Sequence, residues 1–283
     1  MEQRAVDEII LNALREDIGA GDITTESCVP PYKTASARFV AKESGVICGL
    51  WAAARVFELV GDMPNAIMAF NDATEGAEVE AGTVISGVSG GARAILKGER
   101  VALNLLQRMS GIATATAKAV HAVNGGSCRV TDTRKTTPGL RVLEKYAVRA
   151  GGGVNHRFGL YDGVLIKDNH IAASGGIANA VESARRAAPH TLKIEVEAST
   201  LDEVRQALDA RADVIMLDNM SVEQMREAVA LVNGRALTEA SGNMGERDLA
   251  EVAAAGVDLI SIGALTHTVR ALDISLKFDA ADV

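Results

Sequence analysis

Six short apolar runs, separated by helical segments, constrain the fold of this chain more than any other feature. They lie at 129–131, 163–166, 192–196, 214–217, 236–238 and 259–262. Strands that alternate with helices pair in parallel, because each helix returns the chain to the end of the sheet where the next strand begins. Six such units predict an α/β fold with a parallel barrel or a large open sheet.

The beginning of the chain follows a different pattern. Apolar residues at helical spacing over 6–14 predict a short helix that ends at the Gly19–Gly21 loop. Alternation over 35–41 predicts a strand, and the apolar run at 46–48 is a candidate for its returning partner. A further strand is expected at 84–85. Short strands and a helix together indicate a mixed α/β domain.

A long helical stretch follows over residues 92–123. Gly98 and Gly111 interrupt it, and Ser110 is a candidate cap for a helix that restarts at this point. We place the end of the amino-terminal domain in this stretch, so that the domain spans residues 1–109.

A second helix is predicted between the first two apolar runs. Thr137, Pro138 and Gly151 supply its cap, first turn and stop, and its apolar face is Leu140, Leu143 and Ala147. The remaining charged side chains of this helix are expected on its surface: Arg141, Lys145 and Arg149.

The carboxyl terminus departs from the strand–helix rhythm. Apolar and polar residues alternate over 272–278, which is typical of a half-buried strand. We expect this strand to return to the amino-terminal sheet. The predicted organisation is therefore an amino-terminal domain of residues 1–109, joined by 270–283, and an open α/β barrel of residues 110–269.

The charge distribution favours a small anionic ligand. The chain has 283 residues, 48% of them hydrophobic, which is enough for a sizeable core, and its formal net charge of −8 argues against nucleic acid as a partner. Residues 129–170 nevertheless carry eight Lys or Arg against four acids, a local charge of +4. A small polyanion fits this stretch better than a long one.

No apolar run is long enough to span a bilayer, and acidic residues near the amino terminus do not fit a signal peptide. We therefore expect no membrane partner and a cytoplasmic location.

Polar and charged residues follow each of the six predicted strands. In parallel barrels the carboxyl ends of the strands meet at one edge, where reactive groups gather. The residues at these ends are Asp132 with Arg134 and Lys135, then Lys167, Glu197, Asp218, Ser241–Asn243 and Gly263. Lys193, Glu195 and Glu197 also share one strand face and should line the interior, where Glu195 has Lys193 or Lys167 as a candidate partner.

Cations and acids together indicate a phosphorylated substrate that carries a metal ion. Glu197 and Asp218 are candidates to hold Mg²⁺ directly or through its waters. Ser241, Gly242, Asn243 and Gly263 are candidates to bind a phosphate through backbone N–H groups. The chain has neither a Walker sequence nor a dinucleotide-binding glycine motif, which argues against nucleotide hydrolysis and hydride transfer.

Several long segments resemble the signature of quinolinate phosphoribosyltransferases. The most specific are TDTRKTTPGLR at 131–141, EKYAV at 144–148, GGGVNHR at 151–157 and LIKDNH at 165–170. The similarity extends to 16–24, 104–106, 110–114, 217–219, 241–243 and 263–267 and thus covers nearly the whole chain.

This resemblance implies transfer of a phosphoribosyl group from phosphoribosyl pyrophosphate to quinolinate, with decarboxylation to nicotinate mononucleotide in NAD biosynthesis. It implies a mixed α/β domain, an incomplete α/β barrel and a homodimer whose subunits share active sites, with assembly into a hexamer left open. Arg134, His156, Arg157 and Lys167 would contact quinolinate, with Arg100 from the other subunit.

The resemblance also assigns the phosphoribosyl pyrophosphate site. Arg134, Lys135 and Lys167 would hold this substrate, and Glu197 and Asp218 would serve the ribose and Mg²⁺. Its 5-phosphate would bind at Ser241, Gly242 and Gly263, with Asn243, where some relatives have a second glycine, as a further contact. The implied catalytic residues are Lys135, Lys167, Glu197 and Asp218.

Three other functions stay open at this point. One is a phosphoribosyltransferase with the same fold and a different acceptor. Another is a barrel lyase or aldolase that forms a Schiff base at Lys167 or Lys135. A third is a sensor that binds a phosphosugar without catalysis, although one phosphate would not require so many cations.

Overall fold

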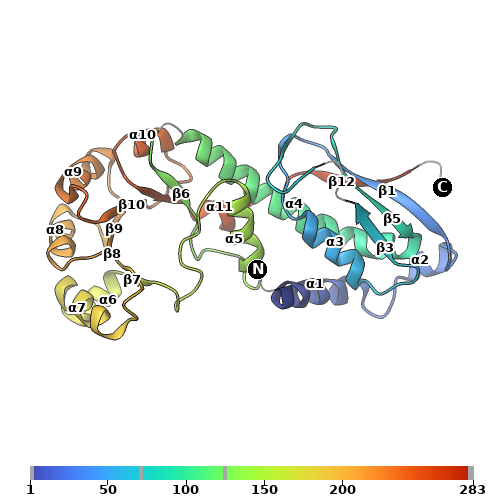
Figure 1. Cartoon of the computed structure of the whole chain (residues 1–283), viewed down its shortest axis with the longest axis horizontal. Coiled ribbons are helices and arrows are strands. Elements are labelled where there is room, and N and C mark those ends of the chain that lie inside the picture. Colours follow the sequence, from blue (N-terminus) through green and yellow to red (C-terminus); the bar gives the residue numbers. More distant parts are fainter. Residues whose placement is uncertain (1–2, 70–72, 124–125, 280–283) are drawn as a thin grey trace. The chain divides into compact units, whose positions relative to one another are not determined.

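The computed structural model describes residues 3–69, 73–123 and 126–279, which divide into two compact units. The first comprises Met1–Ala117, Thr137–Gly152 and Val269–Val283, and the second comprises Lys118–Thr136 and Gly153–Thr268. Figure 1 labels the elements of each. The segment Thr137–Gly152, grouped with the barrel in the sequence, contacts the first unit instead.

An antiparallel sheet forms the centre of the first unit. Its order is β12–β1–β5–β3, built from Ile274–Phe278, Thr34–Ala41, Val84–Gly91 and Ala66–Ala69. Every second residue of β1 is buried, as the alternation predicted. Ala37 to Ala41 pair with Phe278 to Ile274, which confirms that the last strand returns to this sheet.

The predicted strand partner at 46–48 is wrong. The segment β2 (Gly45–Val46) pairs with β4 (Glu78–Val79) in a separate two-stranded ribbon. The long edge of β1 pairs with β5 instead, over Thr34 to Val40.

Three helices of the first unit precede the long one: α1 (Gln3–Ile18), α2 (Ile23–Cys28) and α3 (Leu50–Leu59). The helix α4 (Ala92–Ala122) is continuous, so the predicted restart at Ser110 is wrong. The Ser110 hydroxyl instead donates to the Cys48 carbonyl and accepts from the Cys48 N–H. Gly111 permits close packing, because a side chain there would meet the Arg270 carbonyl oxygen at 2.2 Å.

The helix α5 (Arg141–Ala150) starts later than predicted, with Leu140 and not Thr137 at its cap. Glu144 is 1% exposed and accepts a hydrogen bond from the Thr137 N–H. It also forms an ion pair with Arg108 of α4 at 2.6 Å, and this ion pair holds the segment against α4. Lys145 is 3% exposed, so its prediction as a surface charge is also wrong.

A six-stranded parallel sheet forms the second unit. Its strands are β6 (Arg129–Thr131), β7 (Val164–Ile166), β8 (Ile194–Ala198), β9 (Val214–Asp218), β10 (Leu237–Ser241) and β11 (Leu259–Ser261). The order is β6–β11–β10–β9–β8–β7, so the two edge strands are consecutive in the chain. The six apolar runs predicted a parallel barrel or open sheet, and this sheet, open between β6 and β7, confirms the incomplete barrel that the family resemblance implied.

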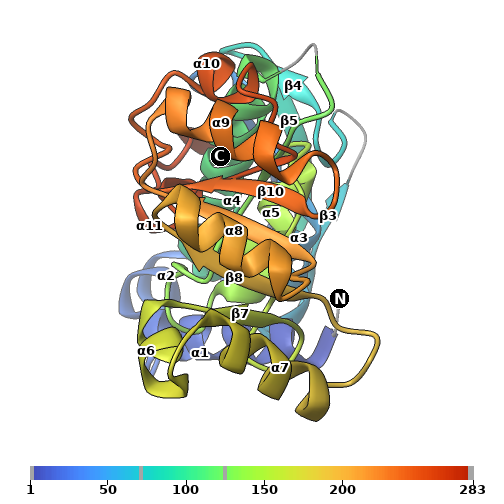
Figure 2. The same ribbon diagram turned by 90° about the vertical axis from the view of Figure 1, so that its left-hand side faces the viewer.

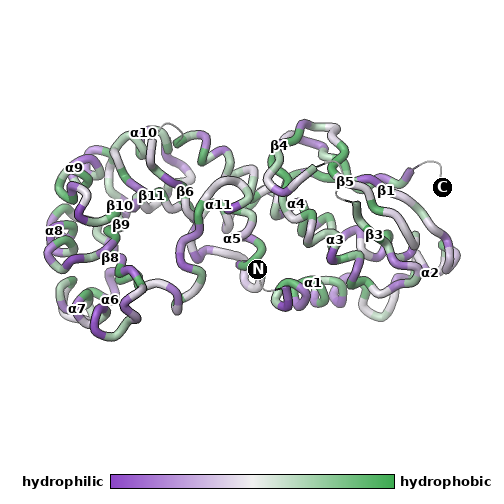
Figure 3. The backbone as a smooth tube through the Cα atoms, viewed as in Figure 1, coloured by the Kyte–Doolittle hydropathy of each residue, from purple (hydrophilic) through white to green (hydrophobic). Residues whose placement is uncertain are grey.

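Helices cover the outer face of this sheet. The helices that contact the strands are α7 (Ile177–Ala187), α8 (Leu201–Asp209) and α9 (Val222–Val232). Next to them, α6 (Asp168–Ser174) contacts α7, and α10 (Leu249–Ala253) contacts α9. The short α11 (Ala264–His267) instead lines the inner side, since Ala264 and His267 face the cavity at the strand ends. Figure 2 shows α8 and α9 lying over the strands. Hydrophobic and hydrophilic turns alternate along these helices (Figure 3), so each buries one stripe on the sheet.

This packing fixes which strand residues face inward. Ile194 and Val196 of β8 are buried on the helix-covered side, so the intervening Glu195 and Glu197 project to the other side. The same alternation turns Asp218 of β9 inward. In the described part of the chain, no helix combines the length and the apolar character that crossing a bilayer requires.

Candidate active site

The carboxyl ends of the strands in the second unit surround a cavity of about 840 Å³. Eleven of the twelve substrate-binding candidates line it: Arg134, Lys135, His156, Arg157, Lys167, Glu197, Asp218, Ser241, Gly242, Asn243 and Gly263. All four catalytic candidates are among them. The parallel fold therefore brings together residues that are up to 129 positions apart, from Arg134 to Gly263.

Arg100 is the exception. It lies on α4 in the first unit, it is exposed, and it is not among the described residues that line the cavity. A role for Arg100 in this chain's site stays a prediction.

Lys167 and Glu197 form an ion pair inside the cavity. The Lys167 Nζ lies 2.7 Å from the Glu197 Oε2. Lys167 also caps α6, and its backbone N–H donates to His170 Nδ1 at 3.0 Å. The predicted pairing of Glu195 with Lys167 is therefore wrong, because Lys167 pairs with Glu197, two residues after Glu195 in β8.

Asp132 positions a segment that carries two site residues. It is fully buried after β6, where it accepts hydrogen bonds from the Asn155 side chain at 2.6 Å and from the His156 N–H at 2.8 Å. Val154 forms a bridge with Thr131 of β6. These contacts fix His156 and the adjacent Arg157 at the open edge of the sheet.

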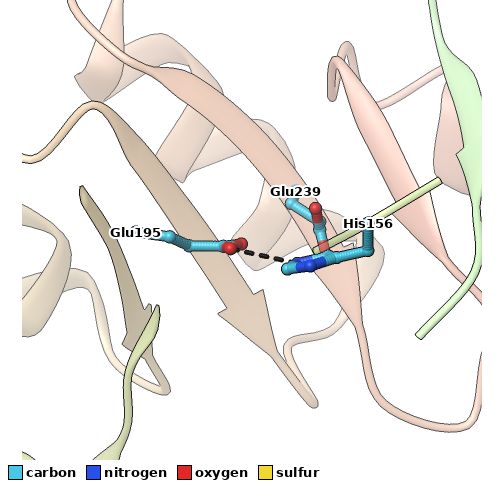
Figure 4. Close-up of side chains that lie close together, drawn as sticks. All are labelled: His156, Glu195 and Glu239. Atoms are coloured by element: carbon cyan, nitrogen blue, oxygen red, sulfur yellow. Dashed lines mark ion pairs between the residues drawn. The ribbon is translucent and has the colours of Figure 1, made fainter. Parts of the chain in front are cut away.

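His156 lies against two buried glutamates, which Figure 4 shows pointing toward its ring. Its Nε2 is 3.0 Å from Glu195 Oε2 and 3.7 Å from Glu239 Oε1. The Arg157 N–H donates to the other ring nitrogen, Nδ1, at 2.7 Å. Because Nδ1 accepts a hydrogen bond, the ring carries its proton on Nε2 and donates it to Glu195.

The two glutamates differ in their surroundings. Glu239 is 2% exposed, and burial, followed by the charge of Glu195, raises the pKa of Glu239 to about 7. His156 and a hydrogen bond from Ser261 oppose this shift of the pKa. The carboxyl group of Glu239 is therefore the natural holder of a proton in this cluster.

Arg134 and Arg157 form the cationic side of the cavity. Burial lowers the pKa of Arg157, and the positive charge of Arg134 lowers it further. The Arg157 guanidinium also donates to the Gly163 carbonyl at 3.0 Å, which fixes its orientation. Two neighbouring guanidiniums form a site for an anion with more than one carboxylate.

A loop after β10 forms another side of the cavity. Gly242 has a φ of 95°, and a side chain there would meet the Asn219 Oδ1 at 2.2 Å. Glycine therefore lets the backbone approach the end of β9 closely. The Thr266 hydroxyl donates to the Lys135 carbonyl at 2.7 Å and fixes the neighbouring loop.

Comparison with known proteins agrees with this geometry. Residues 22–110 match the family model described as the N-terminal domain of quinolinate phosphoribosyl transferase, and residues 112–277 match its C-terminal domain. The chain belongs to the quinolinate phosphoribosyltransferase family. This confirms the resemblance of the sequence segments.

Individual relatives of this family are similar over most of their length. A protein of Bacillus subtilis (strain 168) named probable nicotinate-nucleotide pyrophosphorylase (carboxylating) is 48% identical over 261 residues, which cover 92% of this chain and 89% of that protein. The enzyme of that name from Mycobacterium leprae (strain TN) is 44% identical over 276 residues, 96% of each chain. The solved nicotinate-nucleotide pyrophosphorylase from Francisella tularensis has a TM-score of 0.93 at 38% identity, covering 99% of this chain and 98% of its own.

Within this family fold, the sequence did not identify Glu239 as a site residue. The predicted strand ends at Thr238, whereas β10 continues to Ser241. Glu239 pairs in register with Met216, which also lines the cavity, so its side chain faces inward. A glutamate inside a buried parallel strand was the signal that could have found it.

The carboxylate oxygens of Glu197 and Asp218 are ligands of the kind that Mg²⁺ prefers. Glu197 is the next-to-last residue of β8, Asp218 is the last residue of the adjacent β9, and both line the cavity. Glu197 already pairs with Lys167, and Asp218 accepts from the Asn219 side chain at 2.7 Å. Among the described residues, the one group of three close ligand atoms is His156, Glu195 and Glu239. Glu197 and Asp218 thus suit an ion that keeps waters and substrate oxygens as its other ligands.

Proposed function

We propose that the cavity joins quinolinate to phosphoribosyl pyrophosphate and decarboxylates the adduct, giving nicotinate mononucleotide, pyrophosphate and CO₂. The observation that carries this proposal is the cation-lined cavity at the strand ends, in a chain of this family. Quinolinate has two adjacent carboxylates, and its co-substrate has a phosphate and a diphosphate. Several fixed cations are needed to bind both in one desolvated pocket.

Arg134 and Arg157 would hold the quinolinate carboxylates. Their charges interact, and Arg157 is fixed by its bond to the Gly163 carbonyl. A planar guanidinium can bond both oxygens of a carboxylate, so the pair would orient the pyridine nitrogen toward the ribose. Correct orientation of two bound reactants removes much of the entropic barrier to their reaction.

Lys135 and Lys167 would stabilise the leaving diphosphate. As pyrophosphate departs, positive charge develops on the ribose and negative charge on the leaving oxygen, and fixed cations lower the energy of this state. Mg²⁺ bound through Glu197 and Asp218 would neutralise further charge on the diphosphate. Ser241, Gly242 and Gly263, with Asn243, would bind the 5-phosphate through backbone N–H groups.

Attack by the ring nitrogen makes a pyridinium. The positive nitrogen stabilises the electron pair that stays on the neighbouring ring carbon when its carboxylate leaves as CO₂. The protein's contribution to this step is to hold the adduct and to exclude water.

We further propose a homodimer in which Arg100 enters the cavity of the other subunit. Arg100 is exposed on α4, outside this chain's own cavity lining, and the family resemblance supports its role. A cytoplasmic location, the absence of a nucleic-acid partner and assembly beyond a dimer stay predictions from the sequence.

Two alternative functions place different requirements on the cavity. A Schiff-base lyase needs an amine nitrogen that is free to attack a carbonyl, and the Lys167 nitrogen is engaged by Glu197 at 2.7 Å. A phosphoribosyltransferase with another acceptor needs the same cavity.

One experiment separates these functions. The purified protein is given phosphoribosyl pyrophosphate and Mg²⁺ with quinolinate or, in parallel, nicotinate. The proposal requires nicotinate mononucleotide and one CO₂ per pyrophosphate from quinolinate alone. Pyrophosphate release with nicotinate, and none with quinolinate, would show that the acceptor is wrong. In a separate assay with a carbonyl substrate, borohydride trapping of that substrate on a lysine would show a lyase.

A further inference from the structure

Glu195 and Glu239 have no role in the mechanism above, although they lie against His156, a predicted quinolinate contact. Both glutamates are more than nine-tenths buried, at 6% and 2% exposure, and each has one carboxyl oxygen without a hydrogen-bond partner. Burial of two carboxylates side by side is unfavourable when both are ionised. A polar group buried in this way requires an explanation in function or in strain.

The hydrogen bonds of His156 decide where a proton lies. Its Nδ1 accepts from the Arg157 N–H, so Nε2 is the ring nitrogen that donates a proton to Glu195. Glu239 is the acid of the cluster that holds a proton, because its burial, and then the charges of Glu195 and Asp132, raise the pKa of Glu239.

Glu239 also has access to the substrate space. It lines the cavity together with His156 and Arg157, whereas Glu195 is not among the lining residues. The Arg157 side chain interacts electrostatically with both Arg134 and Glu195. Since Arg134, Arg157 and Glu239 line the same cavity, a pyridine dicarboxylate held by the two arginines would lie in the space that the Glu239 carboxyl group faces.

The reaction needs such a proton. When the carboxylate at C2 leaves as CO₂, the C2–carboxylate bond breaks and its electron pair stays on C2 beside the pyridinium nitrogen. That carbon must gain a proton to give nicotinate mononucleotide. In a cavity that excludes water, the proton has to come from a group of the protein.

We propose that Glu239 is the acid that delivers this proton to C2, with His156 and Glu195 holding it in place. The Glu239 O–H bond breaks as the C2–H bond forms, and water reprotonates the carboxylate after the product leaves. The proposal rests on the proposed function, since only a decarboxylating reaction makes a carbanion at C2.

A single-turnover experiment with Glu239→Gln tests this assignment. Enzyme in excess is mixed with quinolinate, phosphoribosyl pyrophosphate and Mg²⁺, and pyrophosphate, CO₂ and nicotinate mononucleotide are followed in time. The rate constant for net CO₂ release should fall at least about 100-fold, because glutamine cannot act as an acid and CO₂ recombines with a C2 carbanion that is not protonated. Pyrophosphate release should stay within about threefold of wild type, because transfer precedes the step that needs the proton.

The intermediate provides a second readout. The ribosylated pyridine that still carries both carboxylates should accumulate in Glu239→Gln and be detected by mass spectrometry. Glu227→Gln, the same substitution on the exposed surface of α9, should behave as wild type. Equal rates of CO₂ release in Glu239→Gln and wild type would overturn the proposal. A parallel loss of pyrophosphate and CO₂ in Glu239→Gln would also overturn it, because it would show a positioning role.

Two measurements keep the test decisive if Glu239→Gln does not fold. Glu239→Asp retains a carboxyl group at this position. It should release CO₂ faster than any folded variant in which residue 239 is not an acid. In wild type, CO₂ release should slow as the pH rises above about 7, while pyrophosphate formation should not. A rate of CO₂ release that does not change between about pH 6 and 9 would contradict the proposal. If wild type makes no pyrophosphate from quinolinate, the proposed function fails and not the assignment of Glu239.

Discussion

Lys167 Nζ lies 2.7 Å from Glu197 Oε2, so one of the cavity's cations is paired with one of its acids before any substrate is present. The Lys167 side chain remains 46% exposed toward the cavity mouth, whereas that of Glu197 is 14% exposed. An ion pair of this kind keeps both side chains oriented. Binding of a phosphorylated substrate with Mg²⁺ would give each charge a new partner, so little free energy is lost when the pair separates.

The first prediction concerns the cations of the cavity. Arg134→Ala and Lys167→Ala should each lower kcat/KM by at least about two orders of magnitude, because hydrogen bonds to a desolvated anion contribute roughly 1.5–3 kcal/mol each. Steady-state kinetics with circular dichroism checks this. Lys193→Ala is the matched control, since it removes an exposed cation just before β8 and outside the cavity lining. Near-normal turnover in folded Arg134→Ala or Lys167→Ala would refute the assignment of that residue.

The second prediction concerns the metal ion. Activity should require Mg²⁺ and vanish in the presence of chelator, yet chelator should leave the unfolding temperature of the protein unchanged. The reason is that Glu197 and Asp218 do not form a closed protein cage, and the ion would arrive with the diphosphate. Differential scanning fluorimetry and activity assays test both parts. A lower unfolding temperature in chelator would mean that the ion belongs to the folded protein.

The third prediction follows from the raised pKa of Glu239. Its folded-state pKa lies above the unfolded value, so the folded state binds the proton more tightly. The free energy of unfolding should therefore fall as the pH rises from about 4.5 to about 7, by roughly 1–3 kcal/mol for this group. Glu239→Gln removes this dependence, and the variant should gain stability relative to wild type over the same range.

Urea unfolding of both proteins at intervals between pH 5 and 8 measures the difference, in which the other titrating groups cancel. If the stability difference between variant and wild type does not change with pH, Glu239 is ionised throughout. That result would place the proton of the cluster elsewhere.

The sequence predicted most of the site because the parallel fold converts position along the chain into position in space. Asp218 and Ser241 lie 23 residues apart, yet they are direct register partners at the ends of β9 and β10. Any residue that follows an apolar run in such a fold reaches the same edge. For this reason the strand ends could be identified without knowledge of a single tertiary contact.

What the sequence could not supply depends on contacts between distant side chains. Serine is a common helix cap, but the Ser110 hydroxyl forms its hydrogen bonds with the backbone N–H and carbonyl of Cys48. Thr137 and Pro138 suit a helix start, but Glu144 binds the Thr137 N–H and the helix begins after Leu140. The role of Asp132 in holding the His156 segment likewise requires the coordinates.

The last prediction is that each active site is built from two chains, with Arg100 donated across the interface. Arg100 lies on α4 in the first unit, and Lys167 lines the cavity of the second. In a two-fold dimer, a mixed dimer of Arg100→Ala and Lys167→Ala chains would carry both lesions in one site and neither in the other. Two nearly inactive proteins should thus complement one another.

The two variants are unfolded together and refolded at equal concentration, and differently tagged chains verify the exchange. Activity should recover to roughly a quarter of wild type, because half of the dimers are mixed and each has one intact site of two. Either variant refolded alone is the control and should stay inactive. If exchange is verified and activity does not return, Arg100 serves its own subunit or none.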